Sequence, residues 1–220
     1  DIDTENNAIN MQTHTQYGIK KGSLWAAVNL LEEIDVPGEW YMDAKTMTMY
    51  YYPPYELTKE DRFEIATFDS NFISFNGAKY VTIEGVGLTT NADDPQVHSF
   101  NTKGGNGIYI SGSSSDITIK NCTLSHIGMH GIYIETKNVT IDGCVIYNTG
   151  WDGIYCDNCG NRNTLTPSNV VIKNFDISNP CRISGNNAYG VIILSKNTVD
   201  VTIKNNLIHN CENNGIRYGG

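Results

Sequence analysis

The pattern of apolar and polar positions repeats five times between Val81 and the C-terminus. Each repeat opens with a short alternating strand and closes with a strand that begins with glycine. The openings are Val81-Thr82-Ile83, Ile117-Thr118-Ile119, Val139-Thr140-Ile141, Val170-Val171-Ile172 and Val201-Thr202-Ile203. The glycine strands are Gly107-Ile108-Tyr109-Ile110, Gly131-Ile132-Tyr133-Ile134, Gly153-Ile154-Tyr155-Cys156, Gly190-Val191-Ile192-Ile193 and Gly215-Ile216-Arg217-Tyr218. Repetition of one short unit predicts stacked structural repeats.

Equivalent positions of the repeats carry equivalent residues. Two positions after each start stand Ile83, Ile119, Ile141, Ile172 and Ile203, and seven positions after it stand Leu88, Leu124, Ile146, Ile177 and Ile208. Such apolar columns are typical of inward-facing strand positions. Four positions after each start stand only Gly or Asn, namely Gly85, Asn121, Gly143, Asn174 and Asn205. These residues tolerate a left-handed backbone, so this column predicts a turn in every coil. Nine positions after three of the starts stand Asn148, Asn179 and Asn210, for which we expect stacked side-chain amides.

No single repeat is able to bury its own apolar face, so the repeats must stack. We therefore predict an all-β fold, a right-handed parallel β-helix of about five coils, over residues 71–220. A β-sandwich is the alternative, but sandwiches do not keep Gly or Asn at one turn position over five units.

The first 70 residues lack the repeat and predict an N-terminal cap. Ser23 to Glu33 is expected to hold a short helix, and Trp40 to Tyr52 a hairpin around Asp43-Ala44-Lys45-Thr46. An open end of a β-helix needs such a cover. No second cap is visible near Gly220, so we expect the last coil to be covered by a neighbouring domain or exposed by excision.

Charge and hydropathy restrict the partners. The chain has 15 Lys and Arg against 24 Asp and Glu, a net charge of −9. Without a basic run, neither a nucleic acid nor an anionic membrane is an expected partner. No apolar stretch reaches the roughly 18 residues of a spanning helix.

The six cysteines are interpreted mainly as core residues. Cys122 and Cys144 share a column in successive coils, where the Cα separation allows a disulfide, and a pair of buried thiols is the simpler interpretation. Cys156 stands where other repeats have Ile, and a lone Cys156-Asp157-Asn158-Cys159 motif is weak evidence for redox or zinc chemistry. The remaining pair, Cys181 and Cys211, lies near enough in register to bridge.

The glycine strands suggest a binding face. Because the two Ile of Gly-Ile-Tyr-Ile point inward, Tyr109, Tyr133 and Tyr155 point outward as a ladder, continued by Ile192 and Arg217. Rungs about 4.8 Å apart approach the length of one sugar unit, and aromatic faces bind sugars well. Loops at 91–104, 157–169 and 180–189 would wall a groove. Alternatively, the tyrosines only pack on one another.

Polar residues flank this ladder. Glu135 and Asp157 share the column after the strand, and His130 and Asp152 share the column before it. Carboxylates on adjacent coils match the spacing of a retaining glycosidase pair, and they equally match a Ca²⁺ site or solvated surface charges. A lyase is disfavoured because only Arg217 supplies a base on these strands. The full set of expected ligand-binding residues is Tyr109, Tyr133, Tyr155, Arg217, Asn106, His130, Asp152 and Asn214.

These columns resemble the right-handed parallel β-helix superfamily of carbohydrate-active proteins, which includes pectate-lyase-like lyases, glycosidases and a few binding modules. The runs from Asn29 to Tyr41 and from Met49 to Pro54 resemble the segment that precedes the helix in bacterial glycosidase-like members, and 161–169 resembles one of their loops. The resemblance implies the fold and a carbohydrate context.

The short coil count favours a non-catalytic carbohydrate-binding module. We expect it to bind a plant cell-wall polysaccharide, a xylan-like β-linked chain, and to be tethered to the catalytic domains of a secreted bacterial enzyme. No cofactor is expected apart from a possible Ca²⁺ near Glu135 and Asp157. The alternative is a glycoside hydrolase, or a fragment of one, that uses Asp152, Glu135, Asp157 and His130. A purely structural repeat is the third possibility.

Overall fold

The structure is a computed structural model that describes residues 2–3, 5–6, 8–9, 22, 30–43, 45–92, 105–160, 163–164, 166–182, 189–193 and 198–219. The chain divides into two units, Asp1–Phe63 and Glu64–Gly220, which are described separately. This division falls ahead of the predicted boundary between residues 70 and 71. The predicted loops at 91–104 and 180–189 lie largely outside the described residues, and so does most of the helix predicted from Ser23.

The first unit contains two antiparallel strand pairs. Strand β1 (Ile2–Asp3) pairs with β2 (Ala8–Ile9), and β3 (Trp40–Asp43) pairs with β4 (Thr48–Tyr51). The second pair confirms the predicted hairpin, and its turn is held by Asp43, whose Oδ1 accepts the backbone N–H of Lys45 at 2.9 Å. A 3-10 turn, η1 (Leu31–Glu33), precedes the hairpin. The role of this N-terminal unit as a cap stays a prediction.

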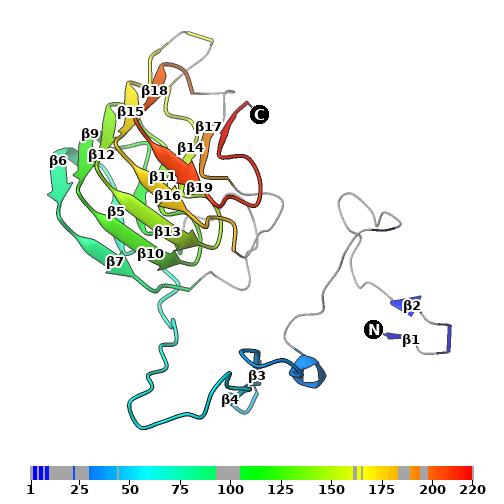
Figure 1. Ribbon diagram of the computed structural model, residues 1–220. Coiled ribbons are helices and arrows are strands. Elements are labelled where there is room, and N and C mark those ends of the chain that lie inside the picture. Colours follow the sequence, from blue (N-terminus) through cyan, green and yellow to red (C-terminus); the bar gives the residue numbers. More distant parts are fainter. Residues whose placement is uncertain are drawn as a thin grey trace. The chain divides into compact units, whose positions relative to one another are not determined.

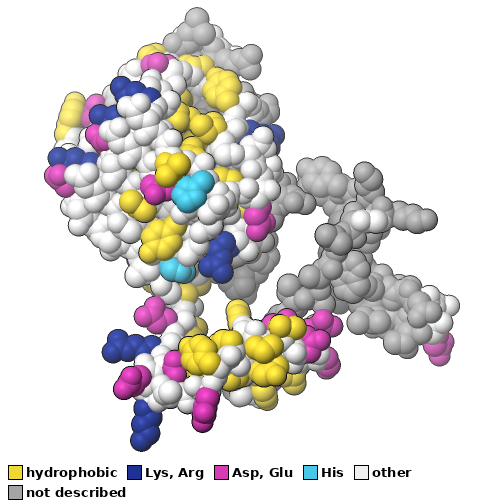
Figure 2. Space-filling model, in the orientation of Figure 1, with side chains coloured by type: hydrophobic (Ala, Val, Ile, Leu, Met, Phe, Trp, Pro, Cys, Tyr) yellow, Lys and Arg dark blue, Asp and Glu magenta, His cyan; other side chains and the backbone are white. Residues whose placement is uncertain are grey.

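The second unit is built from three parallel sheets (Figure 1). Within the described residues, the first sheet comprises β5 (Ile73–Phe75), β8 (Ile108–Ile110), β11 (Ile132–Ile134), β14 (Ile154–Cys156), β17 (Val191–Ile193) and β20 (Ile216–Tyr218). The second sheet comprises β6 (Lys79–Glu84), β9 (Ser115–Lys120), β12 (Val139–Asp142), β15 (Val170–Lys173) and β18 (Val201–Lys204). The third comprises β7 (Gly87–Thr89), β10 (Thr123–Ile127), β13 (Val145–Thr149), β16 (Asp176–Ser178) and β19 (Leu207–His209). Figure 2 shows apolar, His and charged side chains side by side on the outer surface of this third sheet.

Each coil places one strand in each sheet, in the order first, second, third, and the next coil stacks on it. The register joins equivalent positions, as in Ile119↔Ile141 and Leu124↔Ile146. This arrangement confirms the predicted parallel β-helix, with a sixth strand, β20, beginning a further turn. The core is the interior of the coils, where Ile108, Ile119, Leu124, Ile132, Ile141, Ile146, Ile154, Ile172 and Ile177 are all fully buried.

Left-handed backbone marks the corners of the coils. The predicted Gly/Asn column is confirmed, since Gly85, Asn121, Gly143, Asn174 and Asn205 all have positive φ. A second column, Thr90, His126, Asn148, Asn179 and Asn210, has φ between 48° and 65°. A third column, which was not predicted, lies at the beginning of the second sheet, within β6 and β9 and directly before β12, β15 and β18: Tyr80, Asp116, Asn138, Asn169 and Asp200. Side chains stack in this third column, because Asn138 Nδ2 donates to Asp116 Oδ1 (3.0 Å) and Asn169 Nδ2 to Asn138 Oδ1 (2.9 Å).

The three corners differ in length. The corner between the second and third sheets always has two residues: Gly85-Val86, Asn121-Cys122, Gly143-Cys144, Asn174-Phe175 and Asn205-Asn206. The connections at the two ends of the first sheet vary in length instead. Before its strands the shortest connection is 128–131 and the longest is 90–107. After its strands the shortest is 76–78 and the longest is 157–169. All insertions therefore flank the first sheet, and binding residues are found preferentially on such loops above a rigid scaffold.

The cysteines are thiols in the structure. Cys122 and Cys144 are buried, and the backbone N–H of Cys122 points at the Cys144 sulfur at 3.4 Å. Burial raises the pKa of Cys144 to about 12. Cys181 and Cys211 are also unbridged, so the suggested bridge between them is absent.

A glycine column opens the strands of the first sheet because the coils approach closely there. A Cβ at Gly131 would lie 2.6 Å from the backbone oxygen of Gly153 and 2.7 Å from Cγ2 of Ile146. The same conflict occurs at Gly107, Gly153 and Gly190. The close approach explains the glycine in these four repeats, whereas a Cβ at Gly215 would lie 3.5 Å from Cγ2 of Ile208, an ordinary contact.

We expect Gly131→Ala to lower the free energy of unfolding by about 1–3 kcal/mol, because the added methyl group overpacks a rigid site. Gly87→Ala is the matched control, since a Cβ there meets nothing within 4 Å. Urea denaturation of both variants measures the difference. Equal free energies of unfolding for the two variants would show that the coils accommodate the added methyl group without strain.

Candidate functional site

The outer face of the first sheet carries the predicted tyrosine column. Tyr109, Tyr133 and Tyr155 are paired in register on β8, β11 and β14. The rings of Tyr109 and Tyr133 meet edge to face at 5.3 Å, and those of Tyr133 and Tyr155 at 4.8 Å. The ladder therefore exists, with the tyrosines directed away from the core of the coils.

The column is not an exposed platform, which corrects the sequence interpretation. Only 1% of Tyr133 and 2% of Tyr155 is exposed, while Tyr109 is half-buried. The rings form a cluster of their own with Tyr189, and the imidazole of His130 stacks on Tyr155 at 4.6 Å. The period of the strand predicts that these side chains point away from the core of the coils. A second layer of side chains then buries the rings of Tyr133 and Tyr155.

Arg217 and Asn214 lie on the last coil, away from the middle of the ladder. The Arg217 guanidinium donates to the Tyr189 hydroxyl and lies 5.2 Å from the centre of that ring. Asn214 is exposed, and its backbone oxygen accepts the N–H of Gly190 at 3.4 Å. Arg217 is exposed and packs on the aromatic cluster, and its role in ligand binding stays a prediction.

The residues directly before the strands of the first sheet form a buried polar ladder. Asn71 Oδ1 accepts the N–H of Asn106 (3.0 Å), Asn106 Oδ1 accepts that of His130 (3.2 Å), and Asp152 Oδ1 accepts that of Tyr189 (2.5 Å). Asn106, His130 and Asp152 are at most 1% exposed. Asn106 and Asp152, two of the predicted ligand-binding residues, instead satisfy backbone N–H groups between coils, which buried donors require.

His130 and Asp152 lie close together, buried, within this ladder. His130 Nδ1 lies 2.9 Å from Asp152 Oδ2, and neither side chain is more than 1% exposed. His130 Nε2 has no hydrogen-bond partner in the part of the chain that the structure describes. The sequence prediction that the two share a column is confirmed, but their position under the tyrosines removes them from direct contact with a ligand.

Glu135 and Asp157 follow β11 and β14 at equivalent positions on adjacent coils, and both are half-exposed. Their backbone N–H groups donate to Ile110 and Ile134 of the preceding coils at 2.9 Å each. The Glu135 carboxylate accepts hydrogen bonds from Tyr109 (2.5 Å to Oε2) and from Tyr133 (3.0 Å to Oε1). The buried ladder thus fixes the orientation of this carboxylate.

The phenols remain protonated donors. Burial first, and then the Glu135 carboxylate, raise the pKa of Tyr133 far above its usual range. Burial and the Asp157 carboxylate act in the same direction on Tyr155. Since the Tyr133 phenol keeps its proton, it faces Glu135 as a donor, the arrangement that suits an ionised carboxylate.

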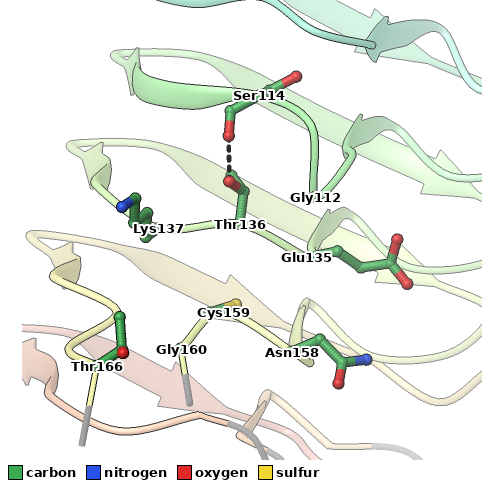
Figure 3. A pocket seen from close by; sticks show the side chains of 9 residues that line it. All are labelled: Gly112, Ser114, Glu135, Thr136, Lys137, Asn158, Cys159, Gly160 and Thr166. Atoms are coloured by element: carbon green, nitrogen blue, oxygen red, sulfur yellow. Dashed lines mark hydrogen bonds between the residues drawn. The ribbon is translucent and has the colours of Figure 1, made fainter. Parts of the chain in front are cut away.

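A pocket of about 230 Å³ lies beside Glu135, at the turns that follow β8, β11 and β14 (Figure 3). Its lining is mixed polar: Gly112, Ser114, Glu135, Thr136, Lys137, Asn158, Cys159, Gly160 and Thr166. Thr136 donates to the backbone oxygen of Ser114, and both are buried. A Cβ at Gly160 would lie 2.6 Å from the oxygen of Thr166, so the floor requires glycine. Sequence reasoning missed this pocket because its residues come from three separate turns.

Two general features bear on partners. Among the described residues, no three His, Cys, Asp or Glu side chains gather where a metal ion would bind, and the Ca²⁺ expected near Glu135 and Asp157 stays a prediction. None of the helices in the described ranges is long and apolar enough to cross a bilayer.

Residues 64–220 match the family model described as a right handed beta helix region. The chain belongs to the right-handed β-helix family. The match covers the three parallel sheets and gives the handedness of the coils. No curated protein and no solved structure matches the chain significantly.

The buried polar ladder of this β-helix yields a stability prediction. Asp152→Ala should lower the free energy of unfolding by about 1–3 kcal/mol, because it leaves the buried Tyr189 N–H without its acceptor. Asp176→Ala is a matched control, since Asp176 pairs with His209 at 3.2 Å but both are about 40% exposed, where such pairs contribute about 0–1 kcal/mol. Chemical denaturation at neutral pH measures both. A small effect at Asp152 would mean that the ladder is not structural.

Proposed function

We propose that the chain is a carbohydrate-binding module that recognises a neutral polysaccharide across the Glu135–Asp157 edge of the first sheet. The observation that supports this most is the pair of half-exposed carboxylates on adjacent coils, one of them oriented by two tyrosines and bordering a polar pocket. The variable connections of the chain also gather at this sheet.

The chemistry of the edge suits sugar hydroxyl groups. A carboxylate has several acceptor positions, and hydrogen bonds to ionised acceptors are the strong ones. Ser114, Thr136, Asn158 and Lys137 add hydroxyl, amide and ammonium groups within the pocket. Tyr109 is the half-buried ring of the ladder and supplies an aromatic contact.

Charge favours a neutral ligand. The net charge of −9 and the two carboxylates repel polyanions such as polygalacturonate unless a cation bridges them. A xylan-like β-linked chain is the first ligand to test, because coil spacing of about 4.8 Å approaches the repeat of an extended sugar chain. The proposal includes secretion with a plant cell-wall enzyme to which the module is tethered.

A second candidate is glycoside hydrolysis by the same two carboxylates. Residues at equivalent positions on adjacent strands match the separation of about 5–5.5 Å found in retaining enzymes. Glu135, which accepts two phenol hydrogen bonds, would act as the nucleophile. Asp157 would then have to hold the proton that the leaving group receives.

Affinity electrophoresis in xylan, with reducing-sugar release measured on the same samples, tests the proposal. We expect the wild type to be retarded and to release no sugar. Glu135→Gln should weaken binding by at least about tenfold, because a hydrogen bond to a charged group contributes about 1.5–3 kcal/mol. Glu84→Gln, which alters the same charge on the second sheet beside Lys120, should not.

Two results would overturn this choice. Steady sugar release that disappears in Asp157→Asn would make the chain a hydrolase. No retardation in any neutral polysaccharide, with or without Ca²⁺, would remove carbohydrate binding altogether. Retardation that EDTA abolishes would establish the predicted Ca²⁺.

A further inference from the structure

We propose that the two ends of the β-helical unit bind each other, so that copies of this chain stack head to tail. The partner of the last coil is the first coil of a second copy, formed by β5, β6 and β7. Within the described residues these three strands lie at one margin of their sheets, and β18, β19 and β20 lie at the other. Strands at a margin present unpaired backbone groups, which are a template for pairing with another chain.

The apolar interior of the coils is open at the last coil. Ile172 and Ile177 of the fourth coil are fully buried. The next residues of the same columns, Ile203 and Ile208, are only half-buried. Together with Ile216, which is 48% exposed, they line a hollow of about 370 Å³. Burial of this surface against a further coil removes apolar side chains from water, which favours association.

Gly215 indicates what covers this end. In the four preceding repeats the glycine that opens the first sheet is required because a Cβ would strike a backbone oxygen of the next coil. At Gly190, for example, a Cβ would lie 2.6 Å from the oxygen of Gly215. Gly215 holds the same place in the last repeat, yet the nearest atom to a Cβ there would be Cγ2 of Ile208, at 3.5 Å. This glycine becomes necessary once a further coil stacks on it.

The charges on the second sheet identify that coil. Outward charges alternate along one column, in which Glu84 pairs with Lys120 at 2.8 Å. Asp142 and Lys173 of the same column pair at 3.0 Å. Lys204 is the next member, and it has no ion-pair partner in the part of the chain that the structure describes. The coil that follows should therefore carry an acidic residue here, and the first member of the column, Glu84, supplies one.

A stacked second copy continues the register of the coils. Each apolar column of the last coil then meets its own first member, with Val201 against Val81, Ile203 against Ile83 and Ile208 against Leu88. The hydrogen bonds of the corners continue as well. The Asn174 N–H donates to the oxygen of Lys204 at 3.3 Å, and in the same way the Asn205 N–H donates to the oxygen of Glu84 in the second copy.

The two contacting surfaces differ, so the association is heterologous and adds one copy after another. It competes with the predicted N-terminal cap for the first coil, and the oligomeric state distinguishes the two. The interface leaves out Glu135 and Asp157, so it is independent of the proposed sugar binding.

Sedimentation velocity of the full 220-residue chain over a wide range of concentration tests the proposal. We expect the mean mass to rise steadily with concentration. Gly215→Ala should weaken association by about tenfold or more, because its methyl group overpacks the stacked coil. Its free energy of unfolding, measured on dilute monomer, should not change. Gly87→Ala, on the outward side of the first coil, is the matched control and should associate like the wild type.

Charge reversal at low salt tests the register. Glu84→Lys and Lys204→Glu should each associate more weakly, because like charges then meet at the interface. An equimolar mixture of the two variants should associate again, since each end then faces the opposite charge. Recovery in the mixture would place Lys204 against Glu84 of the neighbouring copy.

Three results would overturn the proposal. The first is a chain that stays monomeric at every concentration, which would favour the predicted cap over the first coil. The second is a dimer that grows no further and is unaffected by Glu84→Lys, which would indicate contact between two last coils. The third is a Gly215→Ala variant that associates as strongly as the wild type.

Discussion

The spacing between stacked parallel strands, about 4.8 Å, is the constraint on which this structure depends. Because of this spacing, side chains at equivalent positions of neighbouring coils lie against one another, as Ile119 does against Ile141 and Leu124 against Ile146. At the start of the first sheet the approach leaves no room for a Cβ at Gly107, Gly131, Gly153 or Gly190. The left-handed corners then return the chain to the same position in every turn.

The same constraint shapes the polar parts of the molecule. A buried N–H that finds no partner within its own coil must find one on the next, and Asn106 and Asp152 supply the acceptors. Residues of catalytic type are thus used to join coils. The carboxylates that remain half-exposed, Glu135 and Asp157, lie at the other end of the same strands, and Tyr133 connects the two ends because its ring contacts His130 and its hydroxyl reaches Glu135.

The fold was predictable from the sequence because each repeat carries the same residue types at the inward-facing strand positions, and Gly or Asn at the corner between the second and third sheets. Tyr80 and Thr90 are the exceptions, since neither residue type predicts the left-handed conformation that both adopt. The outward direction of Tyr133 was predictable from the strand period, but its burial depends on a further layer that no periodicity describes. His130 and Asp152 were placed in one column from sequence, yet pattern alone does not distinguish a structural polar pair from a binding pair.

The two-residue corner between the second and third sheets has a consequence for how such a chain acquires new specificities. Its first residue is left-handed, and in Asn121-Cys122 and Gly143-Cys144 the second is buried, so that corner has no position where extra residues fit. The connections around the first sheet are under no such restriction. Segments from other proteins are therefore best grafted there, and a recombined β-helix would change its recognition surface while its core and its stacking remain those of the parent.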